Sequence, residues 1–529
     1  MKTEKYGWLI VLAMVMGMLL GVMFAPKIAP GNAPAGRTGH KVESVVELLG
    51  RVYVDSIDAD SLNGRLIGAI LKELDPHCYY FSAEELRRES ESLSGQFEGI
   101  GVVLKYIGDS VFVSQIMPSG PSAGSGLLPG DKLLGVDSTQ LSGAGLNNDE
   151  VVGHIRGRRG TTARLQVLSH GDTEPHTVAV RRGVVSTPTV PYSGMVDEKT
   201  GYIRVSRFGE RTAAEFHNAL SALRRRGMEK LVVDLRGNSG GVLESAVEMA
   251  NELLPRNEMI VYTEGAHSDR KELVSNGGGL FTRGKLAIVI DEYSASASEV
   301  LAGAVQDNDR GLIVGRRSFG KGLVQRQFEL DDGSAVWLTI ARYYTPSGRC
   351  IQRPYNRGTD EYYTEFLNRM FEEALTDTAL AIINDSTPYY TSGGRVVYGG
   401  GGIFPDHVLP YFTDKLLAYV NRLANHSIIE RAAFDYTRAN ARQLLATYPT
   451  ANDFVASFNA PDKLLNQMIE MGEKDGIKRD NASLAKYGAY LRAMLKAYIG
   501  ESLYGDGLFT RIYLDYDDEI ARTLKLLDK

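Results

Sequence analysis

Apolar runs that suit buried strands alternate with helical segments in the middle of this chain, and the alternation restricts its fold more than any other feature. Leu231–Leu235 and Leu286–Ile290 have the composition of buried strands, and Tyr202–Val205 has that of a third. Apolar residues recur at helical spacing in Leu243–Leu254 and again over residues 298–306. Strands that alternate with helices build layered α/β domains, so we expect such a domain here.

Two local patterns predict where further elements begin and turn. Thr212–Glu215 has the residues of a capping box and predicts a helix that ends at the basic Arg224–Gly227. Asp331–Ser334 is typical of a hairpin turn and leads into an expected strand over Ala335–Ile340. The α/β region is therefore expected to carry a hairpin beside its alternating elements.

Length and texture divide the chain into several expected domains. Its 529 residues are too many for one hydrophobic core. Residues 40–94 show helical periodicity, 95–184 contain short β-rich runs, 185–410 form the α/β region, and 411–529 are helical again without a motif. The sequence thus predicts a multidomain α/β protein that ends in a helical region, which could serve in oligomerisation, in binding a partner or as a stabilising cap.

Composition excludes several classes of function. A formal net charge of −6 argues against a broad nucleic-acid-binding surface. Two cysteines, Cys78 and Cys350, cannot supply a disulfide framework or a Cys-rich zinc site. No motif implies a metal or an organic cofactor, so we expect none.

The first thirty residues predict the compartment. Tyr6–Pro26 contains no charged residue and is long enough to cross a bilayer, and Lys2 and Lys5 precede it. By the positive-inside rule, this arrangement leaves the rest of the chain outside the cytoplasm. A signal peptide cleaved near Phe24–Pro26 is the competing interpretation, but no clean A-x-A cleavage site appears there. We favour a signal anchor over residues 1–30, with the body in the cell envelope on the periplasmic side of the cytoplasmic membrane.

A serine-rich turn is the first candidate for chemistry. Asp291–Glu299 follows an expected buried strand and leads at once into an expected helix. Small residues in such a turn leave a hydroxyl uncovered beside the N–H groups of the helix start. Because Ser298 and Glu299 can start the helix, Ser296 is the serine expected to stay free, although three serines in a capping loop would be the plainer interpretation.

A glycine-flanked lysine is the candidate base for this serine. None of the nine histidines has a recognisable triad context. Lys321 lies in Gly315–Gly322, and burial would lower its pKa and make the amine usable as a base. A solvated loop charge is the plainer interpretation. The loop lacks the Ser or Thr of a phosphate-binding P-loop, because Gly322 stands in that place.

A third segment could stabilise negative charge. Asp234–Gly241 also follows a buried strand and opens a helix, and its glycines can bring backbone N–H groups close to a ligand. Such a loop suits an oxyanion hole as well as a phosphate, and it could also be a plain tight turn.

Together and in this order, the three segments resemble the carboxyl-terminal processing peptidases, also called tail-specific serine proteases. The resemblance spans about residues 40–410 and rests on the following segments: Asp234–Gly241, Ser294–Glu299, Phe319–Gln325, Leu74–His77, Tyr344–Arg349 and Gly401–Asp406. It implies a crotonase-like α/β protease core over residues 185–410. It also implies Ser296 as the nucleophile, Lys321 as the general base and Gln325 as the residue that orients the lysine amine. The implied oxyanion hole consists of the N–H groups of Gly241 and Ala297.

The β-rich residues 95–184 resemble the PDZ domain of these enzymes. Gly99, Ile100, Gly101 and Val102 lie where a PDZ loop offers backbone N–H groups to the terminal carboxylate of a substrate tail. Gly126–Asp131 resembles another element of such domains. In the helix over residues 149–155, the apolar positions either line the peptide groove or face the core; these positions are Val151, Val152 and Ile155.

The resemblance implies a serine endopeptidase that cleaves exported proteins near exposed, apolar C-termini. Expected partners are protein substrates with such tails and the membrane through the N-terminal helix, with a second copy of the chain or an adaptor left open. A PDZ-type binding protein with a latent protease core is the alternative. Acyl transfer to or from a thioester is weaker, because the Ser–Lys pair has no obvious role in it.

Overall fold

The structure, a computed structural model, describes residues 39–375, 387–410, 414–505 and 507–529. By its contacts the chain divides into two units, Met1–Ala69 and Ile70–Lys529. The signal anchor expected over residues 1–30 lies outside the described residues. Within the described ranges, no helix combines the length and the apolar character that a membrane span requires.

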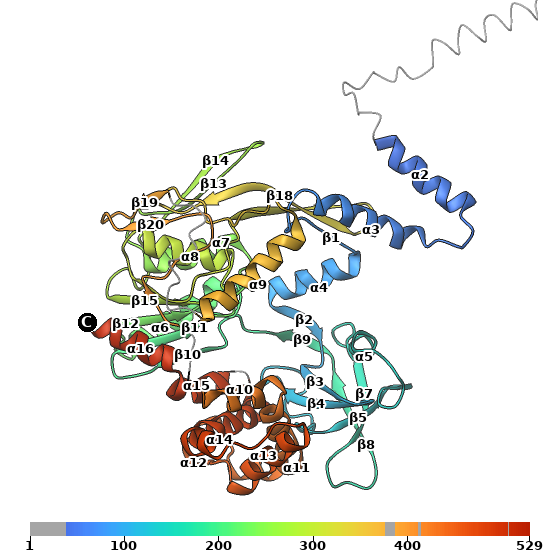
Figure 1. The fold of residues 1–529 in the computed structure, drawn as a ribbon. Helices are drawn as coiled ribbons and strands as arrows, with labels where there is room; N and C mark the ends of the chain where they lie inside the picture. The colour runs from blue at the N-terminus through green and yellow to red at the C-terminus, as the bar shows by residue number, and fades with distance from the viewer. Residues whose placement is uncertain (1–38, 376–386, 411–413, 506) are drawn as a thin grey trace, which may run out of the picture. The chain divides into compact units, whose positions relative to one another are not determined.

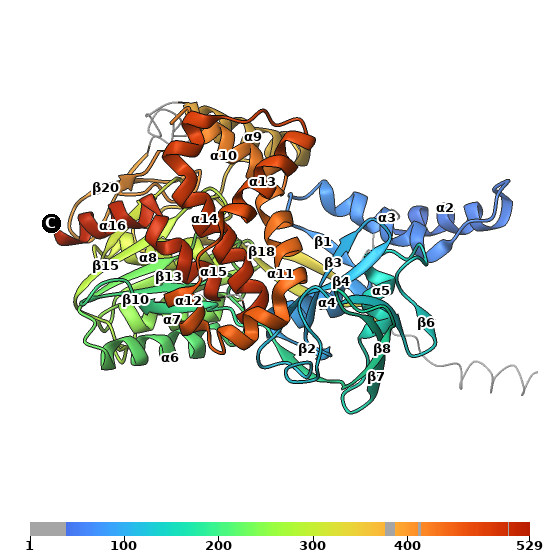
Figure 2. The same ribbon diagram turned by 90° about the horizontal axis from the view of Figure 1, so that it is seen from below.

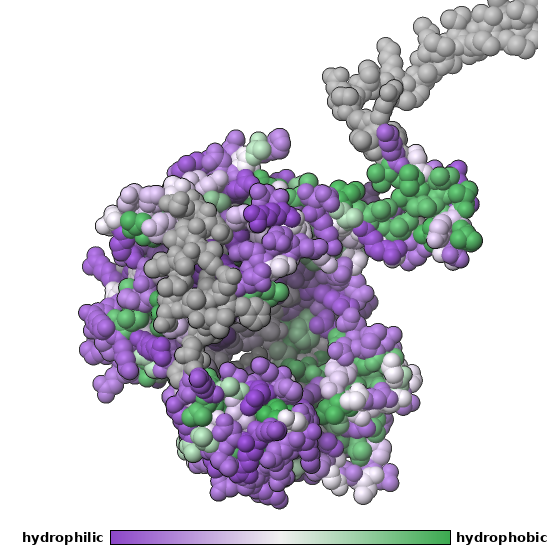
Figure 3. All heavy atoms as spheres, in the orientation of Figure 1, coloured by the Kyte–Doolittle hydropathy of each residue, from purple (hydrophilic) through white to green (hydrophobic). Residues whose placement is uncertain are grey.

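Helices make up the described portion of the first unit. They are α2 (Gly39–Val52) and the greater part of α3 (Ala59–Lys72). One side of α2 carries exposed apolar side chains, and Figure 3 shows them gathered on its surface; they are Val42, Val45, Leu48 and Val52. The helical periodicity over the start of residues 40–94 is thus realised as helices.

The β-rich segment forms a six-stranded antiparallel sheet with one helix (Figure 1). The strands follow the order β3-β4-β5-β7-β8, β6 pairs with β5, and β3 is an edge strand. Their bounds are β3 (Val102–Ile107), β4 (Ser110–Ile116), β5 (Lys132–Val136), β6 (Thr139–Gln140), β7 (Thr162–Leu168) and β8 (His176–Arg181). Helix α5 (Asn148–Ile155) packs on this sheet. The strand before the sheet, β2 (Gln96–Gly99), pairs with the strand after it, β9 (Gly183–Ser186), so the two chain ends of the β-rich segment lie side by side.

A second six-stranded sheet lies at the centre of the α/β region. Its order is β10-β11-β12-β15-β16-β21, and every neighbouring pair is parallel except β10 with β11. Its strands are β10 (Tyr192–Met195), β11 (Thr200–Arg204), β12 (Lys230–Asp234), β15 (Lys285–Ile290), β16 (Leu312–Gly315) and β21 (His407–Val408). The strands expected at residues 202–205, 231–235 and 286–290 are three neighbours in this sheet.

Helices cover both faces of the central sheet. Successive strand residues point to opposite faces, so Ile203 and Val233 pack on one face while Tyr202 and Val232 pack on the other. The first face is covered by α6 (Thr212–Arg225), α7 (Leu243–Leu253) and α8 (Ala297–Asp307). The second face contacts α16 (Asp518–Asp528), which comes from the far end of the chain. Burial on both faces explains why these strands are almost wholly apolar.

A third sheet corrects the expectation that residues 40–94 are wholly helical. Tyr79–Phe81 forms strand β1, which pairs with β18, and α4 (Ala83–Ser94) follows it. The aromatic residues of β1 suit a strand, and the Phe81 ring packs on Trp337 with a centroid separation of 4.9 Å. The other strands are β13 (Met259–Gly265), β14 (Ser268–Val274), β17 (Leu323–Glu329) and β18 (Ala335–Tyr344), with the expected hairpin between the last two.

The start of α6 is a second correction. The helix spans Thr212–Arg225 as expected, but its N-cap is Arg211 and no capping box forms there. The Glu215 carboxylate instead accepts hydrogen bonds from Thr189 and Val190 on the preceding segment. Glu215 therefore forms tertiary hydrogen bonds instead of the local capping bond that its spacing in the sequence predicts.

The last part of the chain is helical, as Figure 2 shows. Its elements are α10 (Leu417–Asn425), α11 (Ile428–Thr447), α12 (Ala451–Ser457), α13 (Asp462–Lys474), α14 (Asn481–Tyr504), α15 (Gly507–Tyr513), the 3₁₀ helix η1 (Leu514–Tyr516) and α16. Its helices from α10 to α15 share a hydrophobic core of their own. We call α10–α16 the C-terminal helical domain. Before it come α9 (Thr359–Leu375) and the hairpin of β19 (Pro388–Tyr390) and β20 (Val396–Tyr398).

Candidate active site

Ser296 occupies a strained turn between a buried strand and a helix. It stands at the cap position of α8, and its backbone has φ 55° and ψ −114°. Residues with a side chain rarely adopt positive φ, and such strain is concentrated at functional sites. The helix begins at Ala297, one residue before the start expected from Ser298, so the cap position belongs to the candidate nucleophile itself.

The two flanking serines are held by the neighbouring loop. Ser294 Oγ donates to the carbonyl of Leu235 at 2.8 Å, and Ser298 Oγ donates to the carbonyl of Asn238 at 2.8 Å. Both side chains are fully buried. These bonds fasten the serine turn to the candidate oxyanion loop, and Ser296 is the serine of the three that lines the adjacent cavity.

Glu299 joins the serine turn to the lysine loop. Its carboxylate is fully buried and accepts hydrogen bonds from Ser296 N at 2.8 Å and from Lys321 N at 2.9 Å. Ser318 Oγ at 2.5 Å and Gly320 N at 2.7 Å donate to its other oxygen. Burial raises the pKa of this carboxyl, while the four donors oppose that shift. One side chain thus sets the position of both candidate catalytic residues.

Tyr343 makes a second connection between the same two segments. Its buried hydroxyl lies 3.1 Å from the carbonyl of Ser296 and 2.5 Å from the carbonyl of Lys321. A rigid aromatic side chain beneath both backbones limits how far the serine turn and the lysine loop can separate.

Lys321 points along its loop toward Gln325. Lys321 Nζ donates to Gln325 Oε1 at 2.8 Å, and Gln325 Nε2 donates to the carbonyl of His77. Burial lowers the pKa of Lys321, and the carboxylates of Asp75 and Glu299 oppose this shift. The hydrogen bond to Gln325 is consistent with the predicted orienting role of that residue, and Lys321 itself is partly buried.

His77 does not compete as a base. Burial, assisted by the charge of Lys321, lowers the pKa of His77 to about 3, so its ring is neutral near neutral pH. Its Nε2 lies 3.1 Å from the hydroxyl of Tyr362. The role of His77 in this site is therefore structural, through the backbone carbonyl that holds Gln325.

The candidate oxyanion loop approaches the serine very closely. Gly240 has φ +98°, and a Cβ placed on it would lie 2.8 Å from the Cβ of Ser296. Only glycine fits there. Gly240 N–H donates to Asn238 Oδ1, whereas among the described residues no acceptor is found for the N–H groups of Gly241 and Ala297. These are the two N–H groups predicted to receive an oxyanion.

One cavity of about 440 Å³ collects the predicted catalytic residues. Ser296, Lys321, Gln325, Gly241 and Ala297 all line it. Its apolar wall comes from α7, α8 and the third sheet; this wall includes Val242, Leu243, Val300, Leu323, Val324 and Trp337. Three segments that lie between positions 241 and 325 of the chain thus meet at one concave site.

The tail-binding loop predicted at residues 99–102 lies at the start of edge strand β3. The Ile100 side chain is buried in the core of the sheet, so the loop can offer only its backbone there. Gly101 has φ +75° and packs against Gly120. Of the three apolar residues on α5, Val151 and Ile155 face the core, and Val152 lines a separate cavity.

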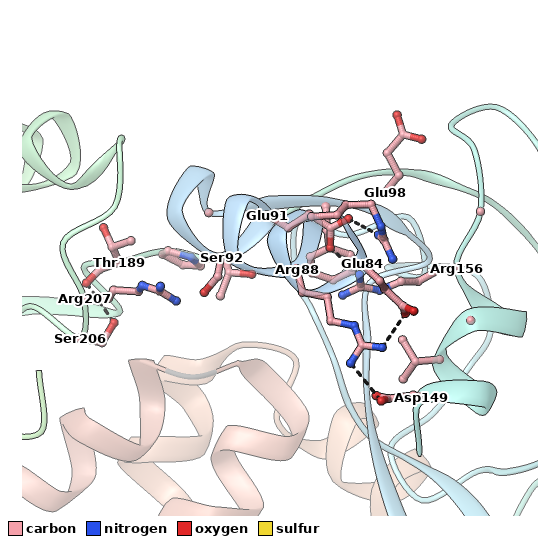
Figure 4. A pocket seen from close by; sticks show the side chains of 18 residues that line it. Glu84, Arg88, Glu91, Ser92, Glu98, Asp149, Arg156, Thr189, Ser206 and Arg207 are labelled. Carbon is pink, nitrogen blue, oxygen red and sulfur yellow. Dashed lines mark hydrogen bonds and ion pairs between the residues drawn. The ribbon is translucent and has the colours of Figure 1, made fainter. Parts of the chain in front are cut away.

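That second cavity, of about 820 Å³, is lined mainly by residues of α4, of α5 and of the segment 187–189 (Figure 4). Arg88 of α4 pairs with Asp149 of α5 at 3.0 Å, and these residues lie at one end of the view. Arg207 lies toward the other end and lines both cavities. It pairs with Glu89 of α4 at 2.6 Å, so a single helix contacts the PDZ-like sheet domain and the rim of the catalytic site.

Comparison with known proteins identifies the family. The model of peptidase family S41 matches residues 199–360, and the PDZ domain model matches residues 89–168. A carboxy-terminal-processing protease of Bartonella bacilliformis is 32% identical over 312 residues, which make up 58% of this chain and 71% of that protein. The chain belongs to peptidase family S41. The matched range contains Ser296 and Lys321, and residues 419–505 match a family of unknown function, DUF8443.

Other relatives of this S41 chain are longer than the region they share with it. A probable CtpA-like serine protease of Staphylococcus aureus (strain COL) is 32% identical over 59% of this chain and 62% of its own length. The protease CtpB of Bacillus subtilis is 31% identical over 59% and 65%. The chain thus spans less than two thirds of these relatives. A solved photosystem II D1 C-terminal processing protease is 28% identical over 58% of this chain and 88% of its own, with a TM-score of 0.33.

Two residues of the S41 site were not predicted from the sequence, Glu299 and Tyr343. Glu299 stands three positions after Ser296, which gives it the spacing of a capping residue and hides its contact with the lysine loop. Tyr343 lies in an aromatic strand with nothing local to distinguish it. Within the described part of the chain, no group of His, Cys, Asp and Glu side chains has the arrangement of a metal site.

The rate of hydrolysis is expected to rise with pH as Lys321 loses its proton. Only the neutral amine accepts a proton, and the lowered pKa of Lys321 places this rise below the pKa of about 10.4 of an ordinary lysine. The measurement is kcat/KM for a short fluorogenic peptide between pH 6 and 10.5. A rate that falls over this range, or that keeps the same ascending limb in Lys321→Ala, would contradict the assignment.

Glu299→Gln is expected to lower kcat by about 10- to 100-fold with little change in KM, because small displacements of reacting groups are costly. In the wild type, backbone N–H groups donate to both carboxylate oxygens of Glu299. In the variant, the NH₂ group of glutamine replaces one of these oxygens and faces N–H donors that it cannot accept from. The free energy of unfolding should also fall by about 1–3 kcal/mol. Glu198→Gln, at an exposed turn residue, is the control. Wild-type kcat in Glu299→Gln would show that the carboxylate does not position the site.

Proposed function

We propose that this chain is a serine endopeptidase that cleaves exported proteins near exposed, apolar C-termini, with Ser296 as nucleophile and Lys321 as general base. The observation that carries the proposal is the shared cavity. A serine in a strained turn, a lysine of lowered pKa and two backbone N–H groups without acceptors among the described residues all line it. This is the set of groups that acyl transfer to serine requires.

The proposed reaction uses only residues of this cavity. Neutral Lys321 takes the proton of Ser296 Oγ as the oxygen attacks the substrate carbonyl. The N–H groups of Gly241 and Ala297 hydrogen-bond the developing oxyanion. The protonated lysine then gives its proton to the leaving amine, and an acyl-enzyme remains on Ser296. Water, deprotonated by Lys321, releases the new carboxylate and restores the serine. Gln325 keeps the amine directed along the loop.

The PDZ domain is proposed to select substrates by their tails. Strand β3 is an edge strand, and a substrate's last residues can pair with its open side in the manner of PDZ ligands. The backbone of residues 99–102 would receive the terminal carboxylate. Apolar walls in the catalytic cavity favour apolar residues around the cleaved bond.

Location and partners complete the proposal. The apolar stretch Tyr6–Pro26 supports anchoring in the cytoplasmic membrane, with the catalytic body on the periplasmic side. Partners would then be exported proteins whose tails are accessible in the cell envelope. A second copy of the chain or an adaptor protein is a further partner to test, since α2 carries an exposed apolar side.

The test uses the purified chain from residue 38 onward and a loosely folded protein with either an apolar or a charged tail. Mass spectrometry of the products should show faster cleavage of the apolar-tailed protein and no cleavage by Lys321→Ala. Equal rates of cleavage for the two proteins would show that the PDZ domain does not select apolar tails. Cleavage by Lys321→Ala at the wild-type rate would show that Lys321 is not the general base.

A latent protease core is the second candidate, and one observation favours it. Among the described residues no hydrogen bond joins Ser296 Oγ to Lys321 Nζ, and the amine donates to Gln325 instead. A free tail peptide that raises the turnover of an untailed substrate would support latency. An unchanged rate would count against it.

A further inference from the structure

The outer face of the PDZ sheet is partly covered by the C-terminal helical domain, at strand β4 and at Lys105 of β3. Strand residues alternate between faces, so Val111 and Val113 of β4 point into the PDZ core while Phe112 points outward. An outward Phe would be exposed on an isolated domain, yet Phe112 is only 4% exposed. Its ring packs edge-on against Phe434 of α11, which is also 4% exposed, with 5.9 Å between centroids.

One face of α11 supplies the charged and aromatic side chains of this contact. Glu430, Phe434 and Arg438 are spaced four residues apart and therefore lie in a row along the helix. Lys105 of β3, directly opposite Phe112 across the strand pair, reaches Glu430 at 2.5 Å and lies over the Phe434 ring. The Arg438 guanidinium lies over the Phe112 ring, 4.9 Å from its centroid. The α11 row and the β3–β4 strand pair are thus complementary in charge and in aromatic packing.

Two glycines allow this close approach. A Cβ on Gly130 would lie 2.7 Å from the Cβ of Arg438. At the other end, a Cβ on Gly505 after α14 would lie 2.9 Å from a ring carbon of Pro118 in the PDZ domain. At these two positions the PDZ domain and the C-terminal helical domain approach too closely for a residue with a side chain to replace the glycine. Such close packing distinguishes this interface from an incidental contact.

The same helical domain is fastened to the catalytic core. Arg236, which follows β12 at the start of the oxyanion loop, pairs with Asp517 at 2.7 Å and with Glu519 at 2.7 Å. Helix α16 packs on the central sheet, and the helices from α10 to α15 share one hydrophobic core. A continuous, packed connection thus leads from strand β3 to the sheet that bears Ser296.

We propose that the C-terminal helical domain is a brace that fixes strand β3, the strand expected to receive the substrate tail, at a set position relative to the catalytic cavity. The inference rests on the proposed function. A tail bound on a fixed strand raises the local concentration of the adjoining chain at the active site, and a loosened domain loses that gain without losing tail affinity. This assigns a function to the region that matches DUF8443.

The test compares hydrolysis of a tailed protein, hydrolysis of a short untailed peptide and binding of a free tail peptide by calorimetry. In Glu430→Lys and Phe434→Ala, kcat/KM for the tailed protein should fall about tenfold, toward the untailed value, as effective concentration is lost. Peptide hydrolysis and tail-peptide affinity should stay at wild-type values. Adding Lys105→Glu to Glu430→Lys restores the ion pair with reversed sign and should recover most of the loss.

Asp475→Asn is the matched control, because it removes the 2.7 Å ion pair between Arg431 of α11 and Asp475 at the end of α13, a pair within the helical domain itself. Wild-type or faster cleavage of the tailed protein by Glu430→Lys, or no recovery in the double variant, would overturn the brace. If the wild type ignores tails, the proposed tail selection fails instead. Hydrogen exchange then tests the brace by itself. The amides of β4 should exchange faster in Phe434→Ala than in the wild type, and an unchanged exchange rate would overturn the brace.

Discussion

Ser296→Ala should abolish hydrolysis, with kcat reduced by about 10⁵- to 10⁶-fold, as happens when a serine nucleophile that acts together with its base is removed. Ser296 stands in the strained turn that lines the catalytic cavity, next to the oxyanion loop. Alanine keeps the Cβ that packs against Gly240, so the fold should survive. The measurement is kcat for a short peptide, with thermal unfolding recorded on the same preparations.

Ser239→Ala is the control for this substitution. Ser239 is exposed and lines the same cavity, but it is not part of the serine turn. Its variant should hydrolyse the peptide at close to the wild-type rate. If Ser296→Ala retains even a hundredth of wild-type kcat in protein free of contaminating protease, another residue is the nucleophile.

Asp234→Ala should cause the largest loss of stability, about 3–5 kcal/mol in the free energy of unfolding, which is typical when one partner of a buried ion pair is removed. Asp234 is fully buried at the end of β12. It accepts hydrogen bonds from Arg236 at 2.7 Å, from Arg204 at 3.1 Å and from the Tyr202 hydroxyl at 2.7 Å. Without it, two guanidinium groups lose their shared buried partner beside the oxyanion loop.

The pH dependence of this effect has a definite sign. Despite burial, the Arg236 and Arg204 cations hold the pKa of Asp234 well below its ordinary value. A carboxyl with a depressed pKa stabilises the fold above its unfolded pKa and loses that effect only as pH falls through the folded pKa. The difference between wild type and Asp234→Ala should therefore persist at pH 5–8 and shrink in strong acid. Urea unfolding measures it.

Asp269→Ala, at an exposed residue of β14, is the control and should change stability by less than about 0.5 kcal/mol. If Asp234→Ala unfolds at nearly the wild-type urea concentration, the buried ion cluster does not hold the end of β12. The link between the oxyanion loop and the C-terminal helical domain would then have to rest on apolar packing alone.

The sequence was most informative where local chemistry and tertiary structure agree. The strands at residues 231–235 and 286–290 are buried on both faces, so their composition alone reveals them. Ser296 is recognisable because a buried strand, small residues and a helix start adjoin. For Lys321 the loop was visible but its environment was not, because the loop does not show which distant carboxylates, Asp75 and Glu299, lie near the amine.

The features that were wrong or missed depend on partners distant in sequence. Thr212–Glu215 has capping spacing, yet Glu215 binds the segment that precedes β10. Strand β1 exists because its aromatic residues pair with β18, more than 250 residues away. Nothing in α11 indicates that the Glu430 row faces the PDZ domain, since these residues would suit a solvated helix face equally well.

Chemical labelling of the nucleophile tests most directly whether Ser296 is activated by Lys321. The purified chain is treated with a fluorophosphonate, which reacts with activated serines, and the labelled peptide is identified by mass spectrometry in wild type and in Lys321→Ala. We expect a single adduct, on Ser296, that forms much more slowly without Lys321. An adduct on another residue, or labelling of Ser296 at the same rate in both proteins, would contradict this expectation.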